Sequence, residues 1–351
     1  MNIKILFFLI ILVLFPHAGS SETIEEDVQP HKIYRSFGSI LPITGKYSQL
    51  GERSLRGIRT AIQHTDQFGK YHVFVKDSKS TIEGASTAYK QLTSEISPLF
   101  VIGPVPSNHV TAIEETNSFI NQPIVIFPII EVKTHRKNIV SFYLPIDNQV
   151  KTLVDFSLRD LKLKKFAVLS PDTGVGKHYS KKFSDYLKIN GGKIVYSGSY
   201  NPDLSDLDTH IKWIESYKLD AIFIPDSAKN STFVIKNIIS DDDITNVIFL
   251  GPNTWNSKIF YNLSKNDFDG IVHKIIFTDF IDKSSEDWIN FSNIYKTLFN
   301  EKPGSYEYQV YLATIYFLEN DLKRQIVSSN NSLTPKSHIL TISEGRIVRL
   351  K

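Results

Sequence analysis

The sequence contains no cysteine. This absence excludes disulfide bonds, thiol catalysis, cysteine-ligated zinc and the acylated cysteine of a bacterial lipoprotein. With 351 residues, of which 41% are hydrophobic, the chain can bury substantial cores without disulfides. Its length fits one large domain or two domains of medium size.

The hydrophobic run near the N-terminus, Ile5 to Phe15, is too short to span a bilayer, which requires about 20 apolar residues. Lys4 precedes the run and small residues at positions 18–20 follow it, which is the pattern of a secretory signal peptide. Residues 1–20 are therefore predicted to be cleaved, so that a soluble mature protein begins near Ser21. Because the exported chain has no thiol, we expect it to reside in a bacterial periplasm.

The sequence also lacks a strong net charge. Its formal charge of +3 becomes +2 once Lys4 is removed with the signal peptide. This balance is too small to indicate binding to nucleic acid or to an anionic membrane surface. We therefore expect no nucleic acid partner.

Motifs for catalysis and metal binding are missing as well, since there is no HExxH and no GxSxG. The glycine-rich segment Gly174 to Lys177 is not a phosphate-binding P-loop. Pro171 occupies the place of its first glycine, and His178 that of the magnesium-binding Ser or Thr. The run Asp241 to Asp243 is typical of a solvated turn, not of a calcium loop. We therefore expect a non-enzymatic protein with no metal site and no cofactor.

The stretch from Gly38 to Ile62 predicts the first βα unit of the fold. Ile40 and Leu41 close an apolar strand, a loop from Pro42 to Gly51 follows, and apolar residues then recur at helical spacing. In open α/β sheets, ligands bind outside the carboxyl ends of the strands. The loop is therefore a candidate ligand-binding segment.

Strands and helices alternate along the rest of the chain in two successive sets. The first set has strands at 71–75, 99–102 and 123–127, with helices at 81–94 and from about 108 to 120. The second has strands at 165–169, 193–196, 221–224, 247–250 and 271–277, with helices from about 177 to 187, at 211–217 and at 233–239. Helices at 288–299 and 306–322 and a hairpin at 339–350, turning at Glu344-Gly345, follow. This alternation predicts parallel sheets in two α/β lobes, with a site in the cleft between them.

Several segments resemble the type I periplasmic solute-binding proteins, the group that includes leucine/isoleucine/valine receptors. The first is ILPITGKYSQLGERSLRGIRTAI, and five more follow in the order and spacing of that family. They are DSKS at Asp77, VIGPVPSNHVTAI at Val101, LSPDTGVGKHYSKKFSDYLKINGGKIV at Leu169, SGSYNPDLSDLDTHI at Ser197 and SYEYQVYLATIYFL at Ser305. The resemblance covers residues 32–351 and implies a two-lobed fold with three crossings between the lobes.

The resemblance also implies where the lobes begin and end. We place the crossings near Leu144 to Asn148, near Thr278 to Ile281, and before Ile339. Residues 32–145 and 281–338 would then form the N-terminal lobe, and residues 146–280 and 339–351 the C-terminal lobe.

Ligand-binding residues are implied in loops of both lobes. Those expected in this chain are Thr44, Tyr47, Ser107, Asn108, Glu131, Gly174, Asp226, Asn253 and Trp255. Ser107 matches the hydroxyl that helps to bind the ligand carboxylate in amino acid receptors, before a helix whose N-terminus favours an anion. Trp255 fits either ligand stacking or packing within a lobe.

Three positions depart from the amino acid receptors. Glu131 stands where a hydroxyl is expected, Val175 where an aromatic residue is usual, and Asn253 where an acid is expected. A carboxylate at Glu131 would repel an amino acid's carboxylate, and the amide of Asn253 cannot neutralise an ammonium group. These departures argue against a simple α-amino acid ligand, although Asp226 could still supply the acid.

The resemblance implies a periplasmic binding protein that closes two lobes on a small polar solute and delivers it to an ABC transporter permease. Two segments, DAIFIPDSA at Asp220 and FLGPNTWNS at Phe249, are closer to the penicillin-binding protein activator-like branch. They leave open an envelope regulator that acts through protein contacts, with a cell-wall synthase as its partner. A receptor needs converging polar groups in its cleft, whereas a regulator can fill the cleft with side chains.

Overall fold

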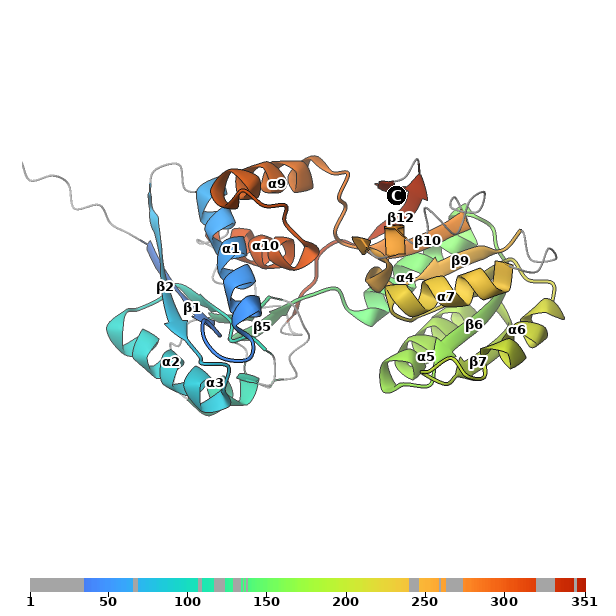
Figure 1. Cartoon of the computed structure of the whole chain (residues 1–351), viewed down its shortest axis with the longest axis horizontal. Helices are drawn as coiled ribbons and strands as arrows, with labels where there is room; N and C mark the ends of the chain where they lie inside the picture. Colours follow the sequence, from blue (N-terminus) through green and yellow to red (C-terminus); the bar gives the residue numbers. More distant parts are fainter. Residues whose placement is uncertain are drawn as a thin grey trace, which may run out of the picture. The chain divides into compact units, whose positions relative to one another are not determined.

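The computed structural model describes residues 35–65, 69–106, 109–116, 124–128, 134, 136, 138–239, 246–258, 260–262, 274–319, 332–343 and 346–351. The described chain forms one compact unit with two β-sheets, of six and seven strands. Helices flank both sheets, which confirms the predicted α/β class (Figure 1).

The first sheet is parallel throughout, in the order β11-β5-β4-β3-β1-β2. Its strands are β1 (Arg35–Leu41), β2 (Tyr71–Asp77), β3 (Phe100–Ile102), β4 (Ile124–Phe127), β5 (Ile139–Phe142) and β11 (Ser332–Leu333). One face packs against α1 (Ser48–Thr65), α9 (Glu286–Phe299) and α10 (Ser305–Glu319), and the other against α2 (Ile82–Glu95) and α3 (Val110–Thr116). Figure 1 shows these helices on the two faces of the sheet.

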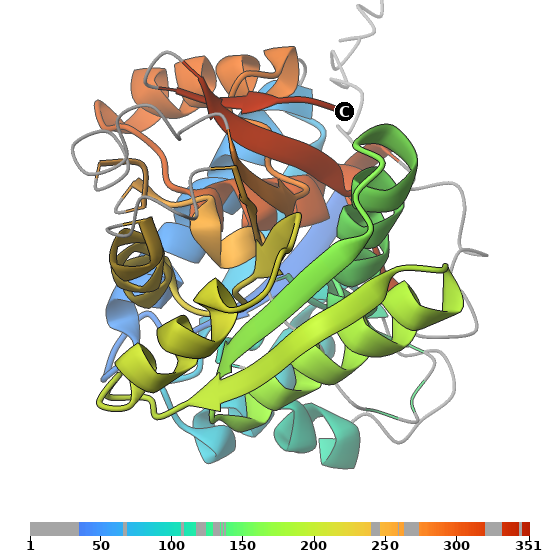
Figure 2. The same cartoon turned by 90° about the vertical axis from the view of Figure 1, so that its right-hand side faces the viewer.

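The second sheet has the order β13-β12-β10-β9-β8-β6-β7, and only the pairs made by β12 are antiparallel among the described strands. Its strands are β6 (Lys165–Pro171), β7 (Lys193–Tyr200), β8 (Ala221–Phe223), β9 (Ile248–Gly251), β10 (Ile275–Asp279), β12 (His338–Ser343) and β13 (Arg346–Arg349). Helices α4 (Ile146–Asp155) and α5 (Gly174–Ile189) cover one face, and α6 (Leu207–Glu215) and α7 (Ala228–Ile239) the other. In Figure 2, β6 and β7 run side by side.

Alternation of side chains along the strands builds two cores in each lobe. In β6, Phe166 and Val168 belong to the core under α4 and α5, whereas Ala167 and Leu169 belong to the core under α6 and α7. Successive side chains of a strand point to opposite faces, so a strand buried on both faces is apolar at every position. This explains why the short apolar runs in the sequence mark the central strands correctly.

The chain passes from one sheet to the other three times, after β5, after β10 and after β11. Two helices begin with their backbone close to the end of the preceding strand. A Cβ atom on Gly51 of α1 would lie 2.2 Å from the carbonyl oxygen of Pro42, and one on Gly176 of α5 would lie 2.2 Å from that of Pro171. Only glycine permits this approach.

The candidate loop, predicted from Pro42 to Gly51, is shorter than expected, because α1 already begins at Ser48.

Some elements escape the sequence patterns. The sequence patterns predict neither β5 nor α4 with its π-helical extension Phe156–Asp160. They also end β7 at Tyr196, although the strand continues to Tyr200. The four residues of β5 are too few for a clear pattern. The serine and glycine residues in the second half of β7 are typical of a loop. The predictions for residues 1–20, Asp241 to Asp243 and the turn Glu344-Gly345 lie outside the described residues.

Candidate functional site

The loop after β1 is held in place by the end of β2. The Asp77 carboxylate accepts hydrogen bonds from the backbone N–H groups of Ile43, Thr44 and Lys79 at 2.7–3.2 Å, and from the Thr44 hydroxyl at 2.6 Å. Burial alone would raise the pKa of Asp77, but these hydrogen bonds lower it. The Thr44 hydroxyl donates to Asp77, so only its lone pairs remain for a ligand.

The same loop has a second brace. Ser80 donates its hydroxyl to the carbonyl oxygen of Thr44 at 2.8 Å and accepts the N–H of Tyr47 at 3.0 Å. The segment DSKS and the first loop, two of the stretches that carry the family resemblance, are thus one hydrogen-bonded structure. Tyr47 is half-buried directly before α1, where it remains a candidate ligand contact.

In the second lobe, Asp226 and Asn253 follow neighbouring strands. Asp226 accepts the hydroxyl of Tyr200 at 2.6 Å, and its carbonyl oxygen accepts the hydroxyl of Thr254 at 2.7 Å. Burial and then the bond to Asp226 raise the pKa of Tyr200, so this hydroxyl stays protonated. The two loops are therefore joined, and Asp226 has a neutral partner.

Gln149 on α4 connects these loops to the first crossing. Its side-chain oxygen accepts the N–H of Asn253 and the hydroxyl of Tyr179, each at 3.0 Å, and its amide donates to the carbonyl oxygen of Leu144 at 3.1 Å. The side chain is buried, with its polar atoms satisfied. Sequence reasoning missed Gln149, because an isolated glutamine in an unrecognised helix gives no signal.

Trp255 and Gly174 differ in their surroundings. The indole of Trp255 is 0% exposed, lies 4.8 Å from the ring of Phe260 and donates to Ser231 at 2.9 Å. It packs within the core of the second lobe and offers no face to a ligand. Gly174 is exposed at the start of α5, which Thr173 caps by accepting the Gly176 N–H at 3.0 Å. Ser107, Asn108 and Glu131 lie outside the described residues.

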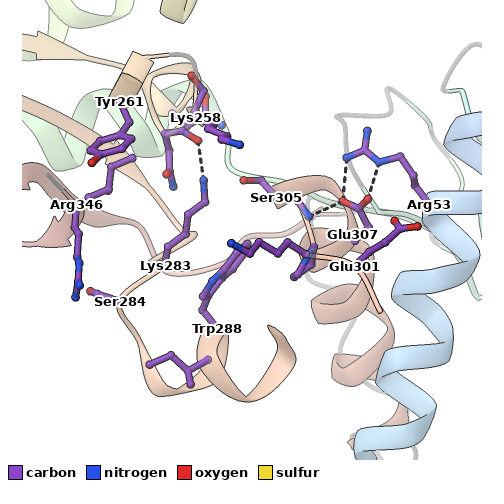
Figure 3. A pocket seen from close by; sticks show the side chains of 18 of the residues that line it. Arg53, Lys258, Tyr261, Lys283, Ser284, Trp288, Glu301, Ser305, Glu307 and Arg346 are labelled. Atoms are coloured by element: carbon purple, nitrogen blue, oxygen red, sulfur yellow. Dashed lines mark hydrogen bonds and ion pairs between the residues drawn. The ribbon is translucent and has the colours of Figure 1, made fainter. Parts of the chain in front are cut away.

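A pocket of about 1420 Å³ is lined by both lobes (Figure 3). Of the predicted site residues that the structure describes, only Asn253 lines it. The lining comes from α1, the starts of α9 and α10 and the turn between them, the segments after β9 and β10, and β13. Its charged residues are Arg53, Arg56, Lys258, Lys283, Lys302 and Arg346, with the carboxylates Glu52, Glu301 and Glu307. Among these described residues, cations outnumber carboxylates by two to one.

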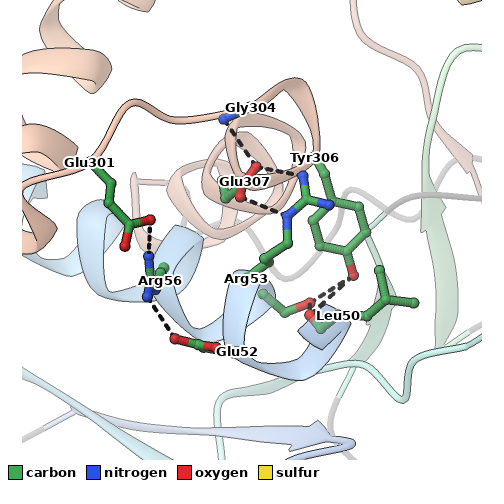
Figure 4. Close-up of polar contacts among 9 residues, drawn as sticks. Leu50, Glu52, Arg53, Arg56, Glu301, Gly304, Tyr306 and Glu307 are labelled. Carbon is green, nitrogen blue, oxygen red and sulfur yellow. Dashed lines mark hydrogen bonds and ion pairs between the residues drawn. The ribbon is translucent and has the colours of Figure 1, made fainter. Parts of the chain in front are cut away.

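All three carboxylates are paired with arginines of α1 (Figure 4). Arg53 donates to both oxygens of Glu307, at 2.7 and 2.9 Å, and Glu307 also accepts the N–H of Gly304 at 3.1 Å. The guanidinium lies 4.7 Å from the ring centre of Tyr306. Burial would raise the pKa of Glu307, but Arg53 outweighs this effect and lowers it.

Arg56 bridges the other two carboxylates. It donates to Glu301 and to Glu52, both at 2.6 Å. These contacts lie within the first lobe, so each carboxylate of the pocket already has an arginine partner there, although Arg56 is shared by two of them and the group keeps one negative charge in excess. A cationic group of a ligand would find no unpaired carboxylate among the described lining residues.

The crossing after β10 adds a buried polar cluster. Asn256 donates its amide to Asp279 at 2.7 Å and to the carbonyl oxygen of Ile281 at 2.6 Å. Lys283 donates to the carbonyl oxygen of Asn256 at 3.3 Å. Burial raises the pKa of Asp279 to about 7 and lowers that of Lys283.

Groups of three or more metal-ligating side chains do not occur among the described residues. Within the same part of the chain, no helix is long and apolar enough to cross a membrane. Besides Gln149, sequence reasoning missed the cations of the pocket. A usable signal was present only on α1, where Arg53 and Arg56 are three positions apart and so share a helix face.

A family model described as periplasmic binding protein matches residues 36–321. Among solved structures, the chain is similar to a protein described as a branched-chain amino acid ABC transporter from Rhodospirillum rubrum. The identity is 15% and the TM-score 0.76, with 90% of this chain and 100% of that chain covered. A search of curated proteins gives no significant match.

Two further structures have the same fold. The substrate-binding protein LivJ of a branched-chain amino acid transporter from Streptococcus pneumoniae, in complex with isoleucine, is 16% identical with a TM-score of 0.59, covering 91% of this chain and 99% of that chain. A solute-binding protein of an ABC transporter from R. palustris, in complex with benzoate, is 15% identical with a TM-score of 0.54, covering 90% and 95%. At such low identities the likeness establishes the fold and not the ligand.

Proposed function

The chain belongs to the periplasmic binding protein family, and we propose that it binds a small polar solute and delivers it to an ABC transporter permease. The pocket of about 1420 Å³, to which both lobes contribute polar side chains, carries this proposal. A ligand that contacts both lobes stabilises the closed form by its differential affinity, and a membrane partner recognises that form. The family consists of solute-binding proteins, so the proposed role is binding and not catalysis.

A regulator of a cell-wall synthase remains less well supported. Such a protein could fill its cleft with side chains, whereas the described residues line a large pocket. The family match also gives no support to the penicillin-binding protein activator-like branch. Thr44 and Tyr47 of the first lobe and Gly174, Asp226 and Asn253 of the second stay our candidate ligand contacts, and of these five Asn253 lines the pocket.

A thermal-shift screen on the mature protein, stripped of ligand by unfolding and refolding, tests the proposal. A bound solute at about 100 times its Kd stabilises the folded state by about 2.7 kcal/mol, which raises the Tm measurably. A positive result should be confirmed by calorimetry. If no solute in a broad panel raises the Tm, a solute receptor is the wrong function.

The branched-chain amino acids are a specific part of this screen. Asn253 supplies an amide where an ammonium group would need a carboxylate, and its own N–H is bonded to Gln149. An unpaired charge costs a few kcal/mol, which reduces affinity tens- to thousands-fold. We expect no binding of leucine, isoleucine or valine at micromolar concentration. A micromolar calorimetric isotherm with any of them would show that our site alignment is wrong.

Export remains a separate proposal. N-terminal sequencing of the protein recovered from the periplasmic fraction should give a start near Ser21. An intact Met1, or tight association with membranes, would contradict cleavage of residues 1–20 as a signal peptide.

A further inference from the structure

The charges that line the pocket are distributed unevenly. Glu52, Glu301 and Glu307 are bound by Arg53 and Arg56 within the first lobe. The other four cations of the lining, Lys258, Lys283, Lys302 and Arg346, have no carboxylate at ion-pair distance among the described residues. Figure 3 shows Lys258, Lys283 and Arg346 apart from the paired Arg53 and Glu307.

Lys283 differs from an ordinary surface lysine. It is half-buried, and its ammonium group donates to a backbone carbonyl oxygen, that of Asn256. Removing an ammonium group from water is costly unless a negative charge compensates it. Asp279, whose charge acts on Lys283, is held by Asn256 and is only partly ionised near neutral pH, since burial raises the pKa of that carboxyl to about 7. The pocket therefore contains a cation whose compensation within the chain is incomplete.

We propose that this pocket binds a small organic anion with two or more carboxylate or phosphate groups, held by Lys258, Lys283, Lys302 and Arg346. The inference rests on the proposed solute-binding function and names its ligand class. A ligand with several negative groups matches four unpaired cations better than a monoanion does. A zwitterion is disfavoured, because each described carboxylate of the lining already has an arginine partner and the six cations of the lining outnumber the three carboxylates.

The pocket has room for such a ligand, and its other lining groups suit one. About 1420 Å³ exceeds the roughly 300–1,000 Å³ of pockets for drug-sized ligands, so a small anion fits within it together with water. Ser257, Ser284 and Ser305 add hydroxyl groups, and Trp288 and Tyr261 add apolar surface. Cations bind and orient the anionic groups, while these residues contact the carbon skeleton.

Calorimetric titration of the stripped mature protein with four compounds tests the inference. The probes are citrate, fructose 1,6-bisphosphate, L-leucine and glucose, measured at ionic strengths of about 0.01 M and about 0.15 M. We expect citrate or fructose 1,6-bisphosphate to bind, and the preferred one distinguishes carboxylate from phosphate recognition. Binding should weaken at the higher ionic strength, where the Debye length falls from about 30 Å to about 8 Å.

Variants locate the site. Lys283→Gln should weaken binding of the preferred anion about tenfold or more, because charge-assisted hydrogen bonds are roughly twice as strong as neutral ones. Arg346→Gln should weaken it to a similar or smaller extent, and it keeps the test valid if Lys283→Gln fails to fold. Lys188→Gln removes the same charge from an exposed position on α5, outside the pocket, and should leave the affinity unchanged.

The possible outcomes separate this inference from the proposed function. Binding of leucine or glucose without binding of either anion would overturn the anion inference and support a solute receptor. Equal affinity of the wild type, Lys283→Gln and Arg346→Gln for an anion would also overturn it. Absence of binding by all four compounds would overturn the inference and weigh against the proposed function.

Discussion

Glu307 on α10 and Asp279 at the end of β10 are both buried carboxyl groups, with exposed fractions of 5% and 3%, but their partners differ. Glu307 is bound by the guanidinium of Arg53 through two hydrogen bonds. Asp279 is held by the neutral amide of Asn256 and by its neighbour's N–H, from Phe280. Burial acts on both in the same direction, yet the pKa of Glu307 is lowered and that of Asp279 is raised to about 7.

The difference shows what a counter-ion adds to a hydrogen bond. A neutral donor stabilises a carboxylate without compensating for its lost hydration, whereas a bidentate arginine does both. Within the first lobe, the charge of Glu307 helps to fasten α10 to α1. In the crossing after β10, the chain keeps an acid that ionises only at a cost, beside a lysine that is also partly buried.

The largest effect is expected from removing the counter-ion of Glu307. Arg53→Met leaves this carboxylate buried and unpaired, which should lower the free energy of unfolding by about 3–5 kcal/mol. Guanidinium denaturation at neutral pH measures the change. The double variant Arg53→Met/Glu307→Gln should recover a large part of it, because no buried charge then remains. A loss of less than about 1 kcal/mol in the single variant would mean that Glu307 is not buried as described.

Asp279 should make the free energy of unfolding decrease as pH rises. Between the usual pKa of 3.8 and about 7, the native state keeps a proton that the unfolded state has lost, so stability falls as pH rises through this window. The full difference corresponds to on the order of 4 kcal/mol. Asp279→Asn should remove this decline.

Denaturation curves at several pH values between 4 and 8 measure this decline in stability for the wild type and for Asp279→Asn. The variant should gain stability relative to the wild type as pH rises, with the difference becoming constant above about pH 7. Parallel pH profiles of the two proteins would show that Asp279 is ionised in the folded state throughout, and that Lys283 compensates it fully.

Features that depend on residues close together in the sequence could be predicted, whereas contacts between distant segments could not. The strands and most helices were predictable, because apolar runs such as Phe100–Ile102 and helical spacing are local signals. The ion pair between Arg53 and Glu307 joins residues 254 positions apart, so no local pattern predicts it. The same holds for Asp279, whose pKa depends on burial by segments that the sequence places far away.

The residues of the candidate site also divide into those that a local pattern could place and those whose role depends on packing. Asp226 and Asn253 could be placed after strands, where the fold brings ligand-binding loops together. The role of Trp255 could not be decided, because an aromatic residue at a strand end is equally compatible with stacking on a ligand and with the packing that the structure shows. Lys283 was missed because only its half-buried position after β10 distinguishes it from the other lysines.

A smaller effect is expected when the acid of the ion pair is removed. In Glu307→Gln, the arginine side chain is 42% exposed and can bind water, so the loss should be about 1–2 kcal/mol at neutral pH. A carboxyl with a lowered pKa contributes stability above its usual value of 4.5, and this contribution is lost as pH falls through the lowered value. The wild type should therefore lose stability more steeply in acid than the variant. Identical acid limbs in the two denaturation profiles would contradict the lowered pKa.

The smallest change in stability is expected for an exposed ion pair, which serves as a reference for the buried carboxyl groups Glu307 and Asp279. Lys181 and Asp185 form an ion pair one helical turn apart on α5, and their side chains are 74% and 56% exposed. Water solvates both charges in the folded state, so Lys181→Gln should change the free energy of unfolding by about 0.5 kcal/mol or less. Denaturation at low and high salt should give the same small value. A change as large as that of Arg53→Met would mean that removing a positive charge destabilises this protein wherever it lies, and the contrast between buried and exposed pairs would then have no energetic basis.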